Sequence, residues 1–335
     1  HVRSVFLRNV NQKEYLGLEQ ARANALRLEF NENNIVRPRQ LGIQVFQEQD
    51  LGVLATNIDW APFFRSWDLH GKFPDILEDE VVGKQAKELY ADALHLLDKI
   101  IREKWFTAKA VFGLFPVNAV GDDIEVYDEA GATEAVFLTL RQQSKKASKI
   151  PNIALSDFIA PKSAGILDYM GCFCVTAGFG ADEKAKEFAD AHDDYNAIMV
   201  KALADRFAEA YAEFLHTEIR KKYWGYAMDE SLELEAIIKE QYKGIRPAPG
   251  YPACPDHLEK STIWKLLSVN EHIGVELTES LAMWPAASVS GYYFAHPDSK
   301  YFGLGRITEE QVEDYAQRRG ISKELAMQWL APNLA

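Results

Sequence analysis

The residues best suited to chemistry lie in one proline-rich segment, residues 246–257, which read RPAPGYPACPDH. Four of the nine residues from Pro247 to Pro255 are proline. Proline lacks a backbone N–H donor and forces extended geometry on the residue before it, which excludes helix and central strand here. The sequence therefore predicts a stiff, extended segment in which carbonyl acceptors outnumber N–H donors.

Three residues of this segment could contact a small ligand. The planar guanidinium of Arg246 suits a carboxylate, and Tyr251 offers a flat aromatic face and a hydroxyl. Gly250 can adopt a positive φ or let a ligand approach the backbone closely. Such a segment could hold a small zwitterion that carries an aromatic base. The alternative is a proline-rich surface crossing in which Arg246 makes a salt bridge.

Other polar residues have a structural explanation that competes with a functional one. Asp205 and Glu209 are spaced i,i+4 on a predicted helix, where a solvated face is the simpler interpretation. His192, His257 and His296 each stand alone, and isolated histidines are usually hydrogen-bonded structural residues. No H-x-x-x-H or H-E-x-x-H pattern occurs in the chain. The histidines therefore predict no metal site.

Composition excludes several classes of protein. The formal net charge of −13 argues against a nucleic-acid partner, because phosphates require a basic face. We find no signal peptide and no apolar run long enough to span a membrane. The three cysteines, Cys172, Cys174 and Cys254, are too few for a disulfide framework and lack zinc spacing. We therefore expect a cytoplasmic protein with core-packed thiols, and its first residue, His1, suggests a piece of a longer chain.

The elements that must position these residues alternate irregularly along the chain. Helical periodicity predicts helices over residues 80–104, 185–223, 232–240, 258–267, 309–319 and 322–330. Short apolar runs bounded by turn residues predict strands over residues 110–117, 123–127, 132–140, 171–176, 288–294 and 301–307. Strands joined by tight turns favour antiparallel pairing. There is no regular strand–helix alternation and no phosphate-binding glycine motif. The sequence therefore predicts one α+β domain with an antiparallel sheet and flanking helices.

The proline-rich segment resembles a signature of the activation domain of cobalamin-dependent methionine synthase. Further segments resemble the same family in the same order, among them DWAPFF (59–64), GKFP (71–74), ILEDEVVG (76–83), HDDYN (192–196), HPDSKY (296–301) and WLAPNL (329–334). The resemblance runs from about residue 40 to the C-terminus. We therefore expect residues 36–335 to form the domain and residues 1–35 to be a linker or an N-terminal extension.

The resemblance implies a fold and a function. The family's domain is a single C-shaped unit built on a bent antiparallel β-sheet flanked by helices. It binds S-adenosylmethionine on its inner surface and supports the reductive methylation of cob(II)alamin, which restores methylcobalamin. A flavodoxin-type electron donor supplies one electron, and the cobalamin is held by another module of the same enzyme. The chain would then be the activation module of a methyltransferase.

The chain lacks the motifs for the main methionine-forming reaction. The cobalamin-binding pattern D-x-H-x-x-G begins at Asp68 and His70, but Phe73 stands where the glycine is needed. No cysteine set for the zinc that activates homocysteine is present. We therefore expect a module that is not catalytically complete alone and acts on a cofactor held elsewhere.

The resemblance also implies roles for individual residues. Arg246 would pair with the carboxylate of S-adenosylmethionine, while Ala248, Gly250 and Tyr251 would hold adenine and ribose through backbone groups. Tyr301 would be a ligand-contacting aromatic, with a strand aromatic facing the core as the alternative. Many relatives carry a second tyrosine at the next position, where this chain has Phe302.

The implied acidic residues are Asp59, Glu209 and Asp205. Asp59 would face polar groups of the ligand, which carries an ammonium and a sulfonium, or would be only a helix-end acid. Glu209 would line the ligand cleft, and Asp205 would face the docked cobalamin module.

Two other functions remain open at this point. One is a stand-alone protein that reactivates a separate corrinoid protein. The other is a protein-interaction module that has lost ligand binding, against which the intact segment 246–252 argues.

Overall fold

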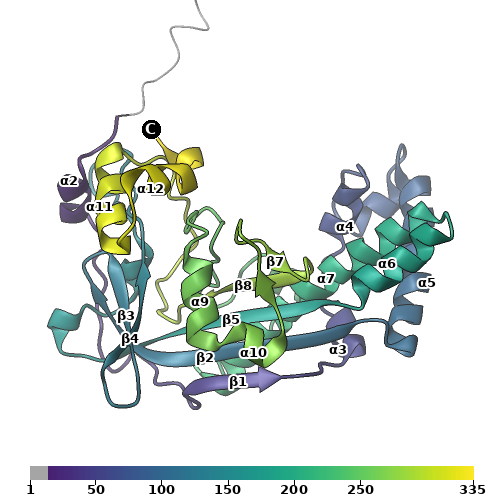
Figure 1. The fold of residues 1–335 in the computed structure, drawn as a ribbon, viewed down its shortest axis with the longest axis horizontal. Helices are drawn as coiled ribbons and strands as arrows, with labels where there is room; N and C mark the ends of the chain where they lie inside the picture. Colours follow the sequence, from purple (N-terminus) through teal and green to yellow (C-terminus); the bar gives the residue numbers. More distant parts are fainter. Residues whose placement is uncertain (1–13) are drawn as a thin grey trace, which may run out of the picture.

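A computed structural model describes residues 14–335 of the chain. Its main sheet has six strands in the order β4-β3-β2-β5-β8, with β1 paired to β2, and every pairing is antiparallel. Figure 1 shows β1, β2 and β5 running along the base, while helices rise at both ends and leave the middle open. The α+β, C-shaped single domain expected from the sequence is confirmed.

The strands of the main sheet are β1 (Gly42–Phe46), β2 (Thr107–Val120), β3 (Asp123–Tyr127), β4 (Thr133–Leu138), β5 (Asp168–Phe179) and β8 (Ser288–Tyr293). A separate two-stranded sheet pairs β6 (Glu276–Leu277) with β7 (Met283–Trp284). The α-helices are α2 (Leu18–Ala23), α3 (Leu51–Ala55), α4 (Ala61–Ser66), α5 (Gly83–Glu103), α6 (Ala181–Asp190), α7 (Asp194–Glu218), α8 (Leu234–Ile238), α9 (Glu259–Leu267), α10 (Val269–Ile273), α11 (Glu309–Arg319) and α12 (Lys323–Trp329). Short 3-10 turns cover Asp75–Glu78, Leu155–Phe158, Lys162–Ala164 and Ala331–Asn333, and a π-helical turn covers Ile219–Tyr223.

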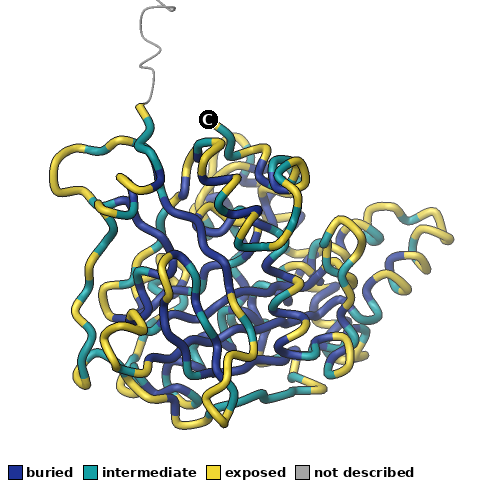
Figure 2. The backbone as a smooth tube through the Cα atoms, turned by 60° about the vertical axis from the view of Figure 1, so that its left-hand side comes forward, coloured by how far each residue is buried: buried dark blue, intermediate teal, exposed yellow. Residues whose placement is uncertain are grey.

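The two central strands are apolar on both faces because helices cover both sides of the sheet. On β5, Phe173 and Val175 face the core formed with α5 and α7, while Cys172 and Cys174 face the core formed with α9 and α10. This alternation confirms that the two thiols share one face and pack in a core. Figure 2 shows the buried positions following these strands through the middle of the molecule.

The prediction of one continuous helix over residues 185–223 is wrong. The chain forms two helices, α6 and α7, that are separated at residues 191–193. His192 takes a φ of 60°, and the Asp193 carboxylate accepts the N–H of Asn196 at 3.1 Å, so Asp193 caps the start of α7. An aspartate whose carboxylate accepts the N–H three residues later is a common start of a helix. The apolar periodicity continues across this point and gives no sign of the break.

The predicted strand over residues 301–307 is also wrong. Only Ile307 makes a bridge there, to Leu334, and residues 301–306 have no regular structure. The segment is instead held by individual contacts, such as the N–H of Leu304 to the carbonyl of Pro252 at 2.7 Å. The strands β6 and β7 have two residues each, too few to show an apolar alternation, and the five-residue strand β1 also lies outside the sequence prediction.

Residues 14–35 pack against the rest of the described chain, and Leu18 and Ala21 of α2 are buried. The N–H of Leu18 donates to the carboxylate of Glu310 on α11 at 2.9 Å. Arg22 contacts Asp122 at 2.8 Å and Asp314 at 2.9 Å, which joins α2 to a β-turn and to α11. The part of the expected linker that covers residues 1–13 lies outside the described residues. Within the described residues, no helix has both the length and the apolar character to cross a membrane.

A buried acidic cluster joins the proline-rich segment to the C-terminal helices. Glu259, at the start of α9, is fully buried, accepts the N–H of Leu138 at 3.1 Å and contacts the guanidinium of Arg319. Arg319 also reaches Asp256 at 3.1 Å. Burial raises the pKa of Glu259 to about 8 against the opposing charge of Arg319. The folded protein therefore binds a proton on Glu259 that the unfolded chain releases nearer its ordinary value of 4.5.

This difference predicts a pH-dependent stability. The contribution of Glu259 is fully present below about pH 4.5 and is lost as the pH rises towards about 8. Glu259→Gln stays uncharged and keeps an oxygen for the N–H of Leu138. We expect its melting temperature to rise relative to wild type between about pH 5 and about pH 9, whereas Glu324→Gln, an exposed control on α12, should follow wild type. Parallel curves for wild type and Glu259→Gln would contradict the assignment.

Candidate functional site

A cavity of about 470 Å³ brings most of the predicted site residues together. Its wall contains Glu209, Arg246, Ala248, Tyr251, Tyr301 and Phe302, together with Glu240, Pro247, Pro252, Ala253 and Val289. These residues come from α7, the turn after α8, the proline-rich segment, β8 and the irregular segment 301–306. Residues far apart in the sequence therefore form one wall, as the sequence analysis expected for six of its eight site residues.

The proline-rich segment is held against the end of β8. The backbone of Ile245 exchanges hydrogen bonds with Phe294 at 2.9 and 3.0 Å, and the N–H of Tyr292 donates to the carbonyl of Pro247 at 2.9 Å. Pro247 provides only an acceptor, which is all that this pairing requires. The segment therefore continues the sheet for three residues and then leaves it, and Ala248 and Tyr251 lie at the point of departure.

A compact turn follows, and Gly250 makes it possible. The N–H of Gly250 donates to the carbonyl of Cys254 at 2.7 Å, and the N–H of Tyr251 donates to that of Ala248 at 3.1 Å. Gly250 has a φ of 91°, and a Cβ there would lie 2.4 Å from the ring of His257. Of the two predicted uses of this glycine, the positive φ is confirmed. The close approach that the structure shows is to His257.

Arg246 is a buried residue of the cavity wall. Its Nη2 donates to Oε1 of Glu213 at 2.5 Å, and its backbone N–H donates to the hydroxyl of Tyr301 at 2.9 Å. The Tyr301 hydroxyl also meets that of Tyr242 at 2.8 Å, and the guanidinium lies 5.9 Å from the centre of the Phe173 ring. The salt bridge expected under the alternative interpretation is present, but it is buried beside a cavity instead of lying on a surface crossing.

Aromatic side chains form opposite parts of the wall. Tyr251 is 57% exposed, so its ring is free to cover a ligand. Tyr301 and Phe302 begin the irregular segment 301–306, and Phe302 packs against Phe158 at a ring separation of 6.2 Å. Of the alternative for Tyr301, the strand is wrong because residues 301–306 form none. The ring does pack against the core formed with α9 and α10, while its hydroxyl accepts the backbone N–H of Arg246.

Carboxylates outnumber cations around this cavity. Glu209 and Glu240 line it, and Glu213 contacts its arginine. Burial raises the pKa of Glu240, the charge of Glu213 adds to this effect, and Arg246 opposes it. Because Glu213 is paired with Arg246, the two lining carboxylates, Glu209 and Glu240, remain to attract positive charge. This wall suits a ligand that carries one carboxylate and more than one positive charge.

Comparison with known proteins agrees with this geometry. Residues 50–320 match the family described as vitamin B12 dependent methionine synthase, activation domain. The chain belongs to this family. A solved structure described as the MetH reactivation domain bound to AdoHcy is similar to it, with 53% sequence identity and a TM-score of 0.93. That similarity covers 96% of this chain and 99% of the other.

Two of the three acidic residues with implied roles in this activation domain, Asp59 and Asp205, lie outside the cavity wall. The Asp59 carboxylate accepts the N–H of Ala61 at 3.0 Å, as expected for a helix-end acid. It lines a second cavity of about 610 Å³, whose wall also contains Ile238 and Lys239, just before Glu240. Asp205 lines a third cavity beside Asp182, Lys201 and residues 285–287. Burial raises the pKa of Asp205, and Arg206 opposes the shift.

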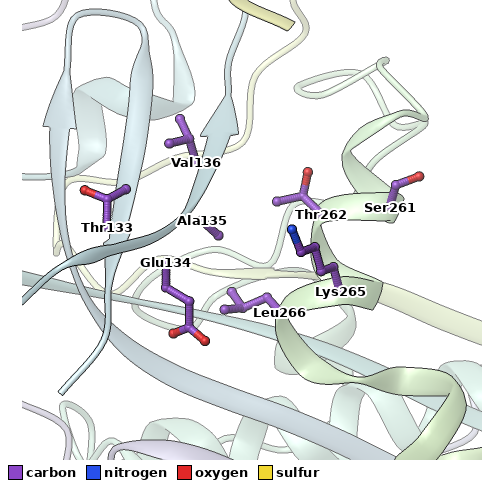
Figure 3. Close-up of a pocket in the computed structure, with 8 residues that line it drawn as sticks. All are labelled: Thr133, Glu134, Ala135, Val136, Ser261, Thr262, Lys265 and Leu266. Carbon is purple, nitrogen blue, oxygen red and sulfur yellow. The ribbon is translucent and has the colours of Figure 1, made fainter. Parts of the chain in front are cut away.

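A cavity of similar size lies elsewhere in the activation domain and has none of this chemistry. Figure 3 shows residues of β4 on one side of it and residues of α9, Lys265 among them, on the other. Its volume is about 520 Å³, and none of the predicted site residues line it. Cavity size alone therefore does not identify the site.

Sequence reasoning missed Glu213, Glu240 and Tyr242 as site residues. Glu213 follows Glu209 by four residues on α7 and therefore lies on the same helix face, which was a usable signal. Glu240 follows α8 with a φ of 55°, a conformation that the sequence does not reveal. Tyr242 reaches the site only through the hydroxyl of Tyr301.

The turn at Gly250 yields a prediction with a matched control. Gly250→Ala and Gly121→Ala both place a side chain at a positive φ, which costs about 1–2 kcal/mol. Only at Gly250 does the new Cβ meet a neighbour within 4 Å, the ring of His257. We therefore expect the larger loss in the free energy of unfolding for Gly250→Ala, and partial rescue by His257→Ala. Equal losses at the two glycines, measured by denaturant unfolding, would refute the close approach.

Proposed function

We propose that this chain binds S-adenosylmethionine in the cavity beside Arg246 and presents its methyl group to cobalamin held by another module. The observation that carries the proposal is the convergence of Arg246, Ala248, Tyr251 and Tyr301 on one cavity. It is supported by the similar structure, which contains AdoHcy, S-adenosylhomocysteine, the product that remains when S-adenosylmethionine loses its methyl group.

The charged side chains in the cavity wall are opposite in sign to the charged groups that this ligand would place beside them. Its α-carboxylate would pair with Arg246, and its ammonium and sulfonium would be favoured by Glu209 and Glu240. We propose that Asp59, in the adjoining cavity, adds to the same negative potential. Backbone groups at Ala248 and Tyr251 would hold the adenosine, with Gly250 shaping the turn between them. Phe302 would contribute an apolar contact where a tyrosine hydroxyl is missing.

The chain's task in this proposal is to position the methyl donor. When a cobalamin module is docked, reduced cobalt supplies the nucleophile for methyl transfer. The methyl carbon leaves the sulfonium with its bonding pair remaining on sulfur, which becomes a neutral thioether. A fixed, correctly oriented methyl group supplies much of the rate advantage of such a displacement. We propose a flavodoxin-type protein as donor of the single electron that the cobalamin requires, and Asp205 as a residue facing the docked module.

The alternatives receive less support. A stand-alone protein that reactivates a separate corrinoid protein gains none from the comparisons, which match an activation domain. The cavity gives no support to a pure protein-interaction module either, because the residues suited to ligand binding lie together in its wall.

Arg246→Ala tests the carboxylate contact. We expect the wild-type chain to bind S-adenosylmethionine at one site, and the variant to bind roughly 10- to 100-fold more weakly, the scale of a charge-assisted hydrogen bond. Calorimetric titration measures both affinities, and Arg102→Ala, an exposed arginine on α5, is the control. Unchanged affinity in a folded Arg246→Ala protein would remove Arg246 from the ligand contact.

Methyl transfer should require a cobalamin module. Free cobalamin meets the bound sulfonium only by random collision, whereas a short flexible tether gives an effective concentration in the roughly millimolar range. We therefore expect conversion of cob(II)alamin to methylcobalamin, followed by absorbance, only with the module and a one-electron reductant present. Rapid methylation of free cobalamin by this chain alone would favour the stand-alone alternative.

A further inference from the structure

An ion pair lies directly against the ligand cavity. Nη2 of Arg246 and Oε1 of Glu213 are 2.5 Å apart, and the two side chains are 12% and 22% exposed. Arg246 is part of the cavity wall, as is Glu209, one helical turn before Glu213 on α7. Glu213 itself is not among the lining residues. It therefore acts on the cavity through the guanidinium that it holds.

The guanidinium of Arg246 is fixed by groups that approach it from different elements. Glu213 holds Nη2 from α7, the ring of Phe173 lies beneath it from β5, and the Tyr301 hydroxyl accepts the backbone N–H. A free arginine side chain loses considerable conformational freedom when it binds a ligand. An arginine side chain that is already held loses little conformational freedom on binding. More of the free energy of its contact with the ligand therefore contributes to affinity.

Glu213 also stabilises the charged form of its partner. Burial alone would lower the pKa of Arg246, but the charge of Glu213, with the neighbouring tyrosines, outweighs burial and raises it. The guanidinium therefore stays charged before any ligand arrives. Among the described residues, Nε of Arg246 and Oε2 of Glu213 are buried without a hydrogen-bond partner, so the pair is not closed on itself.

We propose that Glu213 is a positioning residue for ligand selection: it holds Arg246 in the orientation that recognises the α-carboxylate of the ligand's amino-acid part. The inference rests on the proposed function, because it requires a ligand with that carboxylate. It assigns Glu213 no contact with the ligand. Removing Glu213 should therefore weaken ligands with the carboxylate and leave ligands without it unchanged.

A matched ligand pair isolates this effect. S-adenosylhomocysteine and its decarboxylated analogue differ only in the carboxylate, so the ratio of their dissociation constants measures carboxylate selectivity. For the wild-type chain we expect the analogue to bind roughly 10- to 100-fold more weakly. Arg246→Ala should bring the ratio close to one. If the wild-type chain binds neither ligand, the proposed function fails, whatever Glu213 does.

Variants at Glu213 then test the positioning role. Glu213→Ala should lose most of the selectivity through weaker binding of S-adenosylhomocysteine, with the analogue's affinity unchanged. Glu213→Gln keeps an oxygen that can accept from Nη2, so it should retain more selectivity than Glu213→Ala. It also provides the test if Glu213→Ala does not fold. Glu218→Gln is the control on the same helix, since Glu218 pairs only loosely with Lys222 at 3.9 Å.

Three results would overturn the inference while leaving the proposed function intact. Equal weakening of both ligands by Glu213→Ala would indicate a general structural role. Tighter binding of S-adenosylhomocysteine by that variant would make Glu213 a competitor for the arginine. A change in the affinity for either ligand when Glu213→Ala is added to Arg246→Ala would show that Glu213 acts independently of Arg246.

Discussion

The site depends on the short pairing between the proline-rich segment and the end of β8. Ile245 supplies both a donor and an acceptor to this pairing, and Pro247 supplies only an acceptor. The chain therefore stays paired with the sheet from Ile245 to Pro247 and leaves it immediately afterwards. This geometry places the arginine between β5 and α7, where Phe173 and Glu213 meet it. It also carries Ala248 and Tyr251 to the rim of the same cavity.

Sequence patterns predicted the parts of the fold whose periodicity is long and regular. The helix expected over residues 80–104 forms as α5, and the strands expected near residues 123–127 and 288–294 form as β3 and β8. The long helix failed because Asp193 caps a second helix within an apolar pattern that continues across the break. The strand prediction over residues 301–307 failed because an aromatic-rich run resembles a strand. Individual tertiary contacts hold this run in an irregular conformation instead.

Residue chemistry alone indicated site residues only within one contiguous segment, at Arg246, Gly250 and Tyr251. Ala248, Glu209, Tyr301 and Phe302 were predicted from the family resemblance. Glu213 and Glu240 belong to the site only because α7 and the end of α8 meet the segment in space. Asp59 illustrates the opposite limit. Its local role, accepting the N–H of Ala61, is visible in the structure, while it lines a cavity that shares no wall residue with the one beside Arg246.

The central claim is that S-adenosylmethionine occupies the cavity beside Arg246. The most direct measurement is a crystal structure of this chain grown with the ligand. The account predicts electron density for one molecule, with its carboxylate on the Arg246 guanidinium and its adenosine along residues 248–251. A ligand bound elsewhere at full occupancy, with this cavity holding only solvent, would contradict it.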